Sequence, residues 1–297
     1  MRYFPCLLVI ILSCIMFSLL WSVCGLAQDE YDLQTIYTIP RHIRYSYTLQ
    51  NRTDHMIRGV QFWTYGPVSK TPSQRCVKLT CSHPYEVIAD FAGNQIMHVT
   101  FREFPPYDTK IIGIDADLML SQYPAKENVR DLSAYLKAEQ YIEKDNPAIR
   151  VKANELKQHG TVSTVLNIAQ WIKENIAYSG YTDESLGALW SLTNRKADCT
   201  EIMYLFSALC RVHNIPVRCV EGYRIDNKVI LEPNTYHDWA EFYHDGTWQI
   251  ADPMKGNIMK NQSHYVVMRI IINQNDKLGL TFHRFRYRGD GLAVFMN

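Results

Sequence analysis

Apolar and polar residues alternate along much of the first 120 residues, and this period of two predicts β-strands. The clearest run begins at Ile39 and stops at a polar turn over residues 51–54. Its apolar positions are Ile43, Tyr45, Tyr47 and Leu49. Similar runs, separated by proline or glycine, cover residues 59–65, 77–81, 86–89, 96–101 and 110–118. Short strands at this spacing are typical of a β-sandwich, which we expect over residues 31–120.

The pattern changes after residue 120. Residues 121–160 are more polar, and we expect a helical linker there. Residues 162–176 then carry apolar side chains at steps of three and four, which predicts an amphipathic helix with Thr161 as its cap. We interpret its apolar face as core packing. Residues 161–297 are therefore expected to form a second, mixed α+β domain.

A second helix is predicted to begin at a cysteine. Asp198 has the character of an N-cap and Glu201 occupies the third helical position, so Cys199 lies in the first turn. Free backbone N–H groups and the positive end of the helix dipole favour a thiolate there, and they can also hold an oxyanion. We therefore expect the pKa of Cys199 to be lowered. The alternative is a small buried side chain, which is our interpretation of Cys210 and Cys219.

A β-hairpin brings a histidine and an acid together. Residues 236–244 and 247–252 flank Asp245-Gly246, a pair typical of a type I′ turn. That turn pairs His244 with Thr247 and hence Trp239 with Asp252. Asp252 then lies diagonally across from His237, within reach of its side chain, where a carboxylate fixes the imidazole tautomer. The alternative is a surface hairpin with an unrelated histidine and aspartate.

Four segments together resemble the transglutaminase-like superfamily, whose members are related to papain-type cysteine enzymes. They are Ala-Asp-Cys-Thr-Glu at 197–201, Leu-Cys-Arg-Val-His-Asn-Ile-Pro-Val-Arg at 209–218, Tyr-His-Asp-Trp-Ala-Glu-Phe-Tyr at 236–243 and Trp-Gln-Ile-Ala-Asp-Pro at 248–253. The resemblance covers roughly residues 162–265, and the strand-rich region before it resembles the amino-terminal domain of exported bacterial members.

The resemblance implies a papain-like α+β core with a catalytic triad. Cys199 corresponds to the nucleophile, His237 to the base and Asp252 to the orienting acid. The chain departs from the family pattern at Ala197, where glycine is usual, and at Asp238, where a small apolar residue is more common. An acid beside His237 can shift its pKa and alter the rate. Trp190 is the candidate for an oxyanion side chain.

The expected activity is thiol-dependent attack on an amide or peptide carbonyl of a protein or peptide substrate. Water as acceptor gives a peptidase or amidase, and an amine gives a transglutaminase; the sequence leaves both open. A non-catalytic binding or scaffold protein that keeps the fold is the alternative. We expect no cofactor and no metal, since Cys76, Cys81 and His83 lack the fourth ligand of a structural zinc site.

Composition and charge narrow the class of protein. The chain has 297 residues, room for about two domains, and 47% of them are hydrophobic, as in globular proteins. Lys plus Arg number 31 against 30 Asp plus Glu, a net charge of +1 that argues against a nucleic-acid partner. The alternation of Arg284, Arg286 and Arg288 with other side chains fits either a basic face for an anionic polymer or a solvated sheet face; we favour the second.

Residues 1–27 have the pattern of an export signal. Arg2 precedes an uncharged run over residues 4–23, and Gly25 and Ala27 form a small-x-small cleavage site. A run of about 20 residues can also span a bilayer, so a membrane anchor remains open. We expect an exported protein, periplasmic or otherwise extracytoplasmic.

Five cysteines follow this leader, and an odd number leaves at least one thiol free. They are Cys76, Cys81, Cys199, Cys210 and Cys219. On one strand, Cys76 and Cys81 would lie about 16 Å apart, well beyond the reach of a disulfide.

Overall fold

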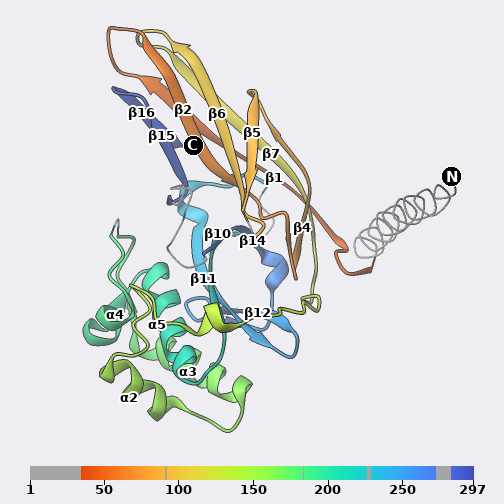
Figure 1. Ribbon diagram of the computed structural model, residues 1–297, viewed down its shortest axis with the longest axis vertical. Coiled ribbons are helices and arrows are strands. Elements are labelled where there is room, and N and C mark those ends of the chain that lie inside the picture. The colour runs from red at the N-terminus through yellow and green to blue at the C-terminus, as the bar shows by residue number, and fades with distance from the viewer. Residues whose placement is uncertain (1–34, 91, 183, 226–228, 272–281) are drawn as a thin grey trace, which may run out of the picture.

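A β-sandwich occupies one end of the molecule and a group of helices the other, with a five-stranded antiparallel sheet between them (Figure 1). The computed structural model describes residues 35–90, 92–182, 184–225, 229–271 and 282–297. The predicted α+β class, a β domain joined to a transglutaminase-like core, is confirmed.

The sandwich consists of two antiparallel sheets in the orders β16-β1-β7-β4-β3 and β15-β2-β6-β5. Their strands are β1 (Ile39–Asn51), β2 (Ile57–Gly66), β3 (Lys70–Thr71), β4 (Gln74–Cys81), β5 (Tyr85–Ala89), β6 (Gln95–Phe104), β7 (Thr109–Leu120), β15 (Phe285–Arg288) and β16 (Leu292–Met296). Each predicted strand is present, and the four apolar positions of β1 are all buried. The apolar positions of the alternating pattern are thus the side chains that face the space between the two sheets.

The last two strands correct the expected domain boundaries. β16 pairs with β1, and β15 pairs with β2, so the carboxyl end of the chain completes the sandwich rather than the second domain. Phe285 on β15 packs its ring against Tyr47 and Phe62, which explains why this strand is held there. Arg286 and Arg288 are exposed, which agrees with our interpretation of this strand as one side of a solvated sheet face.

The expected helical linker is only partly helical. Residues 121–146 are mostly irregular apart from the 3-10 turn η1 (Ser133–Leu136), and α2 (Pro147–Leu156) follows. Ile149, Ala153 and Leu156 of α2 are buried in the core around α5 (Cys199–Val212), so α2 belongs to the second unit.

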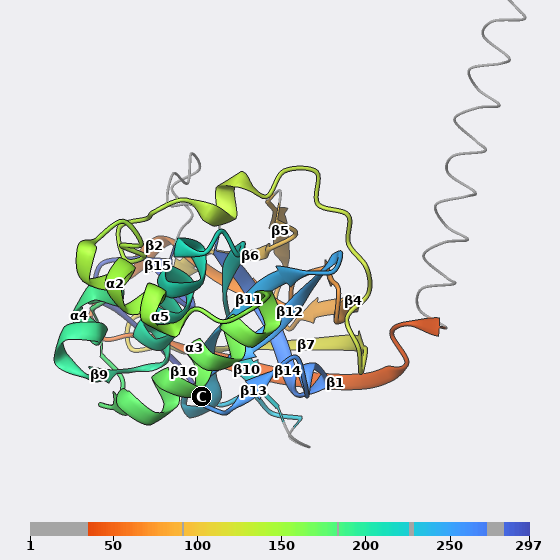
Figure 2. The same ribbon diagram turned by 90° about the horizontal axis from the view of Figure 1, so that it is seen from below.

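The second unit consists of helices packed on one face of the central sheet (Figures 1 and 2). The remaining helices and 3-10 turns are α3 (Thr161–Asn175), α4 (Ala188–Asn194), η2 (Pro233–Thr235) and η3 (Gln262–His264). The sheet has the order β13-β12-β11-β10-β14. Its strands are β10 (Val217–Arg224), β11 (Tyr236–His244), β12 (Thr247–Asp252), β13 (Asn257–Ile258) and β14 (Tyr265–Ile271), and a short parallel pair joins β8 (Ala177–Tyr178) to β9 (Lys196–Ala197).

Helix α3 confirms the predicted amphipathic helix, but its N-cap lies one residue earlier than expected. Gly160, at φ 92°, occupies the N-cap position and Thr161 is the first helical residue. Glycine takes this positive φ without the steric cost that threonine would meet.

The apolar core of the sandwich extends into the second unit, while the side chains around α5 form a separate cluster. Tyr223, Ile225, Leu231, Val266 and Met268 of the second unit belong to the same buried cluster as the interior of the sandwich. In the described part of the chain, no helix is long and apolar enough to cross a membrane. The predicted leader, residues 1–27, lies outside the described residues.

Candidate functional site

Helix α5 begins as the sequence predicts. The Asp198 side chain caps it, accepting hydrogen bonds from the backbone N–H groups of Thr200 at 2.8 Å and Glu201 at 3.2 Å. Cys199 is therefore the first helical residue. The helix ends at Val212, and Asn214 takes the expected left-handed conformation with φ 56°. Since the cap occupies two of the first-turn amides, those two are not available to an oxyanion.

The expected lowering of the Cys199 pKa is wrong. Burial raises the pKa of this thiol well above its usual value, and the nearby carboxylates of Asp238 and Asp198 raise it further. The backbone amides of Asp238 and of Cys199 itself act in the opposite direction but do not offset these effects. The first turn of a helix favours a thiolate only where the surroundings do not add negative charge and remove water.

The cysteines outside the leader are all unbridged, as expected for Cys76 and Cys81. Cys210 and Cys219 are fully buried, and burial raises the pKa of the Cys219 thiol to about 12. Both therefore fit the interpretation as small core side chains.

The hairpin has the predicted register. Asp245 and Gly246 both have positive φ, and His244 pairs with Thr247 at the start of a ladder that reaches Ala240 and Ala251. His237 and Asp252 meet as this register requires: His237 Nε2 lies 2.7 Å from Asp252 Oδ2. The two residues are only 5% and 0% exposed, so water does not compete for this bond.

Asp252 is fixed by further bonds that the sequence did not reveal. The Tyr265 hydroxyl on β14 donates to Asp252 Oδ2 at 2.7 Å, and the Lys255 amide donates to Oδ1 at 3.1 Å. Asn257 Nδ2 in turn donates to the Tyr265 hydroxyl at 2.7 Å. Asn257 pairs with Asp252 across the short β12–β13 turn, whereas Tyr265 comes from β14 at the far edge of the sheet order, so no local sequence pattern links Tyr265 to Asp252.

Cys199 lies beside the strand that carries His237. Helix α5 packs on β11, and the sulfur lies near the backbone amide of Asp238, the residue after His237. Within the described ranges, no hydrogen bond joins Cys199 to His237. Because Asp252 binds Nε2, the ring nitrogen left for another partner is Nδ1.

Asp238 is a buried acid next to this cysteine. Thr200 Oγ1 donates to its Oδ2 at 2.5 Å, while its Oδ1 has no partner within the described ranges. Burial and the charge of Glu221 raise the pKa of Asp238 to about 6. Glu221 itself is ionised: although burial opposes it, Arg269 at 3.1 Å helps lower the pKa of Glu221 to about 2.

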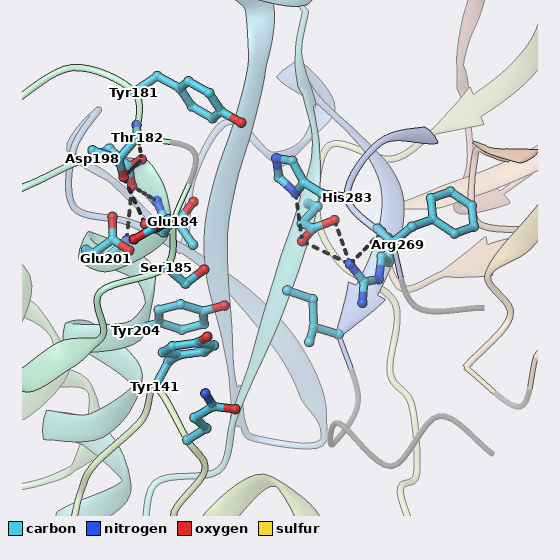
Figure 3. Close-up of a pocket in the computed structure, with 15 residues that line it drawn as sticks. Tyr141, Tyr181, Thr182, Glu184, Ser185, Asp198, Glu201, Tyr204, Arg269 and His283 are labelled. Carbon is cyan, nitrogen blue, oxygen red and sulfur yellow. Dashed lines mark hydrogen bonds and ion pairs between the residues drawn. The ribbon is translucent and has the colours of Figure 1, made fainter. Parts of the chain in front are cut away.

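A cavity of about 360 Å³ opens beside the start of α5 (Figure 3). Asp198 and Thr200, the two chain neighbours of Cys199, both line it. One wall carries carboxyls and tyrosines, and His283 and Arg269 face it from the other side (Figure 3).

Trp190 lies on α4, and its backbone carbonyl accepts a hydrogen bond from Asn194. No contact in the described part of the chain ties its side chain to Cys199, so its expected part in an oxyanion site stays a prediction. Nor do the described residues contain a group of three side chains arranged to hold a metal ion.

A buried helix carrying a cysteine at its first residue, packed on an antiparallel sheet with a histidine and an acid, defines the papain-like class of fold. Residues 150–253 match the transglutaminase-like superfamily, so the chain carries a transglutaminase-like core domain. The superfamily is one of thiol-dependent enzymes. Comparison with curated proteins finds no match.

Two solved structures illustrate the similarity. A protein from Cytophaga hutchinsonii, proposed to be a cysteine protease, is 19% identical with a TM-score of 0.58, and the match covers 87% of this chain and 92% of that one. The periplasmic domain of TgpA from Pseudomonas aeruginosa is 14% identical with a TM-score of 0.41, over 76% and 91% of the two chains. The first similarity supports the fold across both units, sandwich included.

Proposed function

We propose that this protein is an exported thiol enzyme that transfers an acyl group from an amide carbonyl of a protein or peptide to water or an amine. Cys199 is the nucleophile, His237 the base and Asp252 the acid that orients the base. The observation that carries the proposal is the buried 2.7 Å bond between His237 Nε2 and Asp252 Oδ2, on the strand against which the Cys199 helix packs.

The resting enzyme holds a protonated thiol. Because the pKa of Cys199 is raised, the thiol proton must leave as the sulfur attacks. His237 Nδ1 is the acceptor, since Asp252 occupies Nε2 and stabilises the imidazolium that forms. The Cys199 and His237 side chains approach one another when substrate binds, as catalytic hydrogen bonds often tighten only in the complex.

The chemical steps follow from these positions. The sulfur forms a bond to the carbonyl carbon, and the C–N bond breaks as the leaving amine takes the proton from His237. A thioester remains on Cys199. Water or an amine then attacks it, giving its proton to His237, and the thiol reforms when the C–S bond breaks. The backbone amides of Cys199 and Asp238 interact with the sulfur and are the candidate donors to the oxyanion.

The test is to trap the thioester. The full chain is incubated with a mixture of glutamine-containing peptides, and the acylated residue is located by mass spectrometry while ammonia release, peptide cleavage and incorporation of a primary amine are recorded. We expect acylation at Cys199 and none in Cys199→Ala. Cys76→Ala, which removes a half-buried thiol of the sandwich, is the matched control and should keep full activity.

A scaffold protein would show no acylation, ammonia release, peptide cleavage or amine incorporation with any peptide in the mixture. Acylation at another cysteine, or turnover that survives Cys199→Ala, would contradict the assignment of the nucleophile. Alkylation of the free protein does not distinguish an enzyme from a scaffold protein. The raised thiol pKa makes alkylation of Cys199 slow in both.

A further inference from the structure

Two buried carboxyl residues lie opposite each other against the first turn of α5. Asp238 on β11 and Glu221 on β10 are register partners, so their side chains lie on the same face of the sheet. They are only 3% and 5% exposed. Asp238 is also bonded to α5 through Thr200, the residue after Cys199. Negative charges at directly opposed positions repel each other, and burial disfavours them further, so this pair favours a state with one added proton.

Hydrogen bonds determine which of the two carboxyls takes that proton. Glu221 is surrounded by donors: the Arg269 guanidinium lies 3.1 Å from Oε2 and 3.2 Å from Oε1, and the Tyr236 hydroxyl donates to Oε2 at 2.9 Å. His283 Nδ1 lies 3.6 Å from Oε1. Asp238 accepts one bond, from α5, and its Oδ1 has no partner within the described ranges. Because donors stabilise a carboxylate, Glu221 stays ionised and Asp238 takes the proton.

The pKa values of the two acids agree with this division. Burial and the charge of Glu221 raise the pKa of Asp238 to about 6, while the positive charge of His283 acts in the opposite direction. Although burial opposes ionisation of Glu221, Arg269 and His283 lower its pKa to about 2. Asp238 therefore changes charge in mildly acidic solution. After burial, its charge is the largest influence that raises the pKa of Cys199.

We propose that Glu221 is a positioning residue for the reaction: it makes Asp238 take up a proton in mildly acidic solution, which removes the negative charge beside the Cys199 sulfur. The proposal rests on the function proposed above, because it takes Cys199 as the nucleophile. It adds a control of that thiol by acidity, set from the neighbouring strand. His283 precedes β15, so the segment that leads into the sandwich takes part in this control.

Several other ionisable groups face Asp238 or Glu221. They are Cys199 and Tyr204 on α5, Cys219 on β10, Tyr236 and His237 on β11, Arg269 on β14, and His283. Burial raises the pKa of these tyrosines and cysteines, so they stay neutral. Histidines also change charge between pH 5 and 8. Beside Cys199, the pKa of Asp198 is lowered by hydrogen bonds although burial opposes this, and burial raises that of Glu201 to about 8. A comparison at each pH of proteins with and without Asp238 cancels these shared effects.

The measurement is the rate at which dipyridyl disulfide modifies Cys199 in the full chain from pH 4.5 to 7.5. This reagent is activated by its own protonation and so stays reactive in acid, and peptide mapping locates the modified residue. At each pH the rate in Asp238→Asn is divided by the rate in the protein that keeps Asp238. We expect this ratio to be about ten at pH 7.5 and about one at pH 4.5, with its midpoint near pH 6.

Two substitutions should move this midpoint in opposite directions, each measured with and without Asp238→Asn. Glu221→Gln removes the charge that opposes ionisation of Asp238 but keeps an acceptor oxygen, so the midpoint should fall by about one pH unit. His283→Gln removes a positive charge and keeps a donor for Glu221, so the midpoint should rise by about half a unit. Glu241→Gln, which breaks another buried ion pair between β10 and β11, is the matched control and should leave the midpoint in place.

A ratio that is the same at pH 4.5 and pH 7.5 would overturn the proposal. A midpoint that stays in place in Glu221→Gln, or that moves equally in Glu241→Gln, would overturn it as well. If circular dichroism shows that Glu221→Gln does not fold, His283→Gln decides, and an unchanged or lower midpoint there contradicts the proposal.

The two proposals fail separately, because dipyridyl disulfide reacts with the thiol without any substrate. Thioester formation with an unmoved midpoint removes the positioning role of Glu221 alone. The expected midpoints without thioester formation remove the proposed catalytic function and leave a pair of coupled carboxyls beside a cysteine.

Discussion

Asp238 is the residue whose charge most affects Cys199, the proposed nucleophile. It follows His237 directly, lies buried, and its charge opposes ionisation of Cys199. The bond from Thr200 Oγ1 holds it in place at the first turn of α5. The Cys199 thiol is therefore protonated at neutral pH, and in the proposed mechanism it loses its proton only when the sulfur attacks the substrate.

Replacing Asp238 by asparagine should make Cys199 more reactive. Asparagine keeps the volume and an acceptor for Thr200 Oγ1 but removes the charge, so the thiol pKa should fall. A fall of one unit corresponds to about tenfold more thiolate at pH 8. The measurement is the rate of iodoacetamide modification at Cys199, followed by peptide mapping.

Asp117→Asn on β7, a half-exposed acid of the sandwich far along the chain from Cys199, serves as control and should leave that rate unchanged. An Asp238→Asn protein that is alkylated no faster would show that Asp238 does not set the thiol pKa.

Tyr265 should act through Asp252. Tyr265→Phe removes the hydroxyl that donates to Asp252 Oδ2 and so loosens the acid that orients His237. We expect kcat to fall about tenfold, the equivalent of one hydrogen bond, with KM nearly unchanged. Steady-state kinetics on the peptide identified by thioester trapping provide the measurement.

Tyr85→Phe offers a matched control, because its hydroxyl donates to the Leu79 carbonyl at the same 2.7 Å within the sandwich. It should leave both constants unchanged. A similar loss of kcat in Tyr85→Phe would mean that general destabilisation, and not the position of Asp252, explains the effect.

Among the elements, β10 holds β11, the strand that carries His237, in register with β14. Gly222 on β10 pairs with His237 on β11 on one side and with Val267 on β14 on the other, next to a β-bulge. A Cβ atom at Gly222 would lie 2.0 Å from the Val266 carbonyl oxygen and 2.9 Å from the Trp239 ring. Glycine at this position lets two backbones approach closely.

Gly222→Ala should therefore be strongly destabilising. The clash is with backbone, which cannot move without shifting β14 and the Tyr265 it carries. We expect a loss of about 3 kcal/mol or more in the free energy of unfolding, measured by denaturant titration. Gly113→Ala on β7, where a Cβ would meet only Ser82 at 3.8 Å, should change stability little; equal losses in the two variants would contradict this explanation.

The elements also show what the sequence could and could not predict. The hairpin register was predictable because Asp245-Gly246 acts locally, and α5 because Asp198 caps it within three residues. The pairing of β15 with β2 could not be predicted. It joins Phe285 to Thr64, and neither segment carries a sequence pattern that identifies its partner strand. The wrong direction for the Cys199 pKa has a similar cause, because burial and the approach of Asp238 from β11 are tertiary effects.

At the scale of the whole molecule, the two units should unfold together, because one buried cluster spans both. Phe285→Ala removes a ring packed on Tyr47 and Phe62 and should cost about 2 kcal/mol of stability. Heating should then show a single transition, lowered in temperature, at which activity and circular dichroism are lost together.

The matched control is Phe295→Ala on β16, whose ring is 44% exposed and which should have little effect. Activity that survives the melting of the sandwich would show that the units are independent.

Export is the second prediction at this scale. When the full chain is made in a bacterium, the uncharged run at residues 4–23 should carry it out of the cytosol. A chain that begins at residue 28 should fold but remain in the cytosol, as cell fractionation and circular dichroism would report. Cytosolic recovery of the full chain in folded, active form would refute export.

The return of the carboxyl end to the sandwich determines when the chain can finish folding. The edges of β1 and β2 stay unpaired until residues 285–296 reach them, so these residues must be synthesised before either sheet is complete. Until then both sheets lack an edge strand, and the interior that they share with strands β10 and β14 stays incomplete. The first unit to be started along the chain is therefore the last to be completed, after every strand of the central sheet has been synthesised.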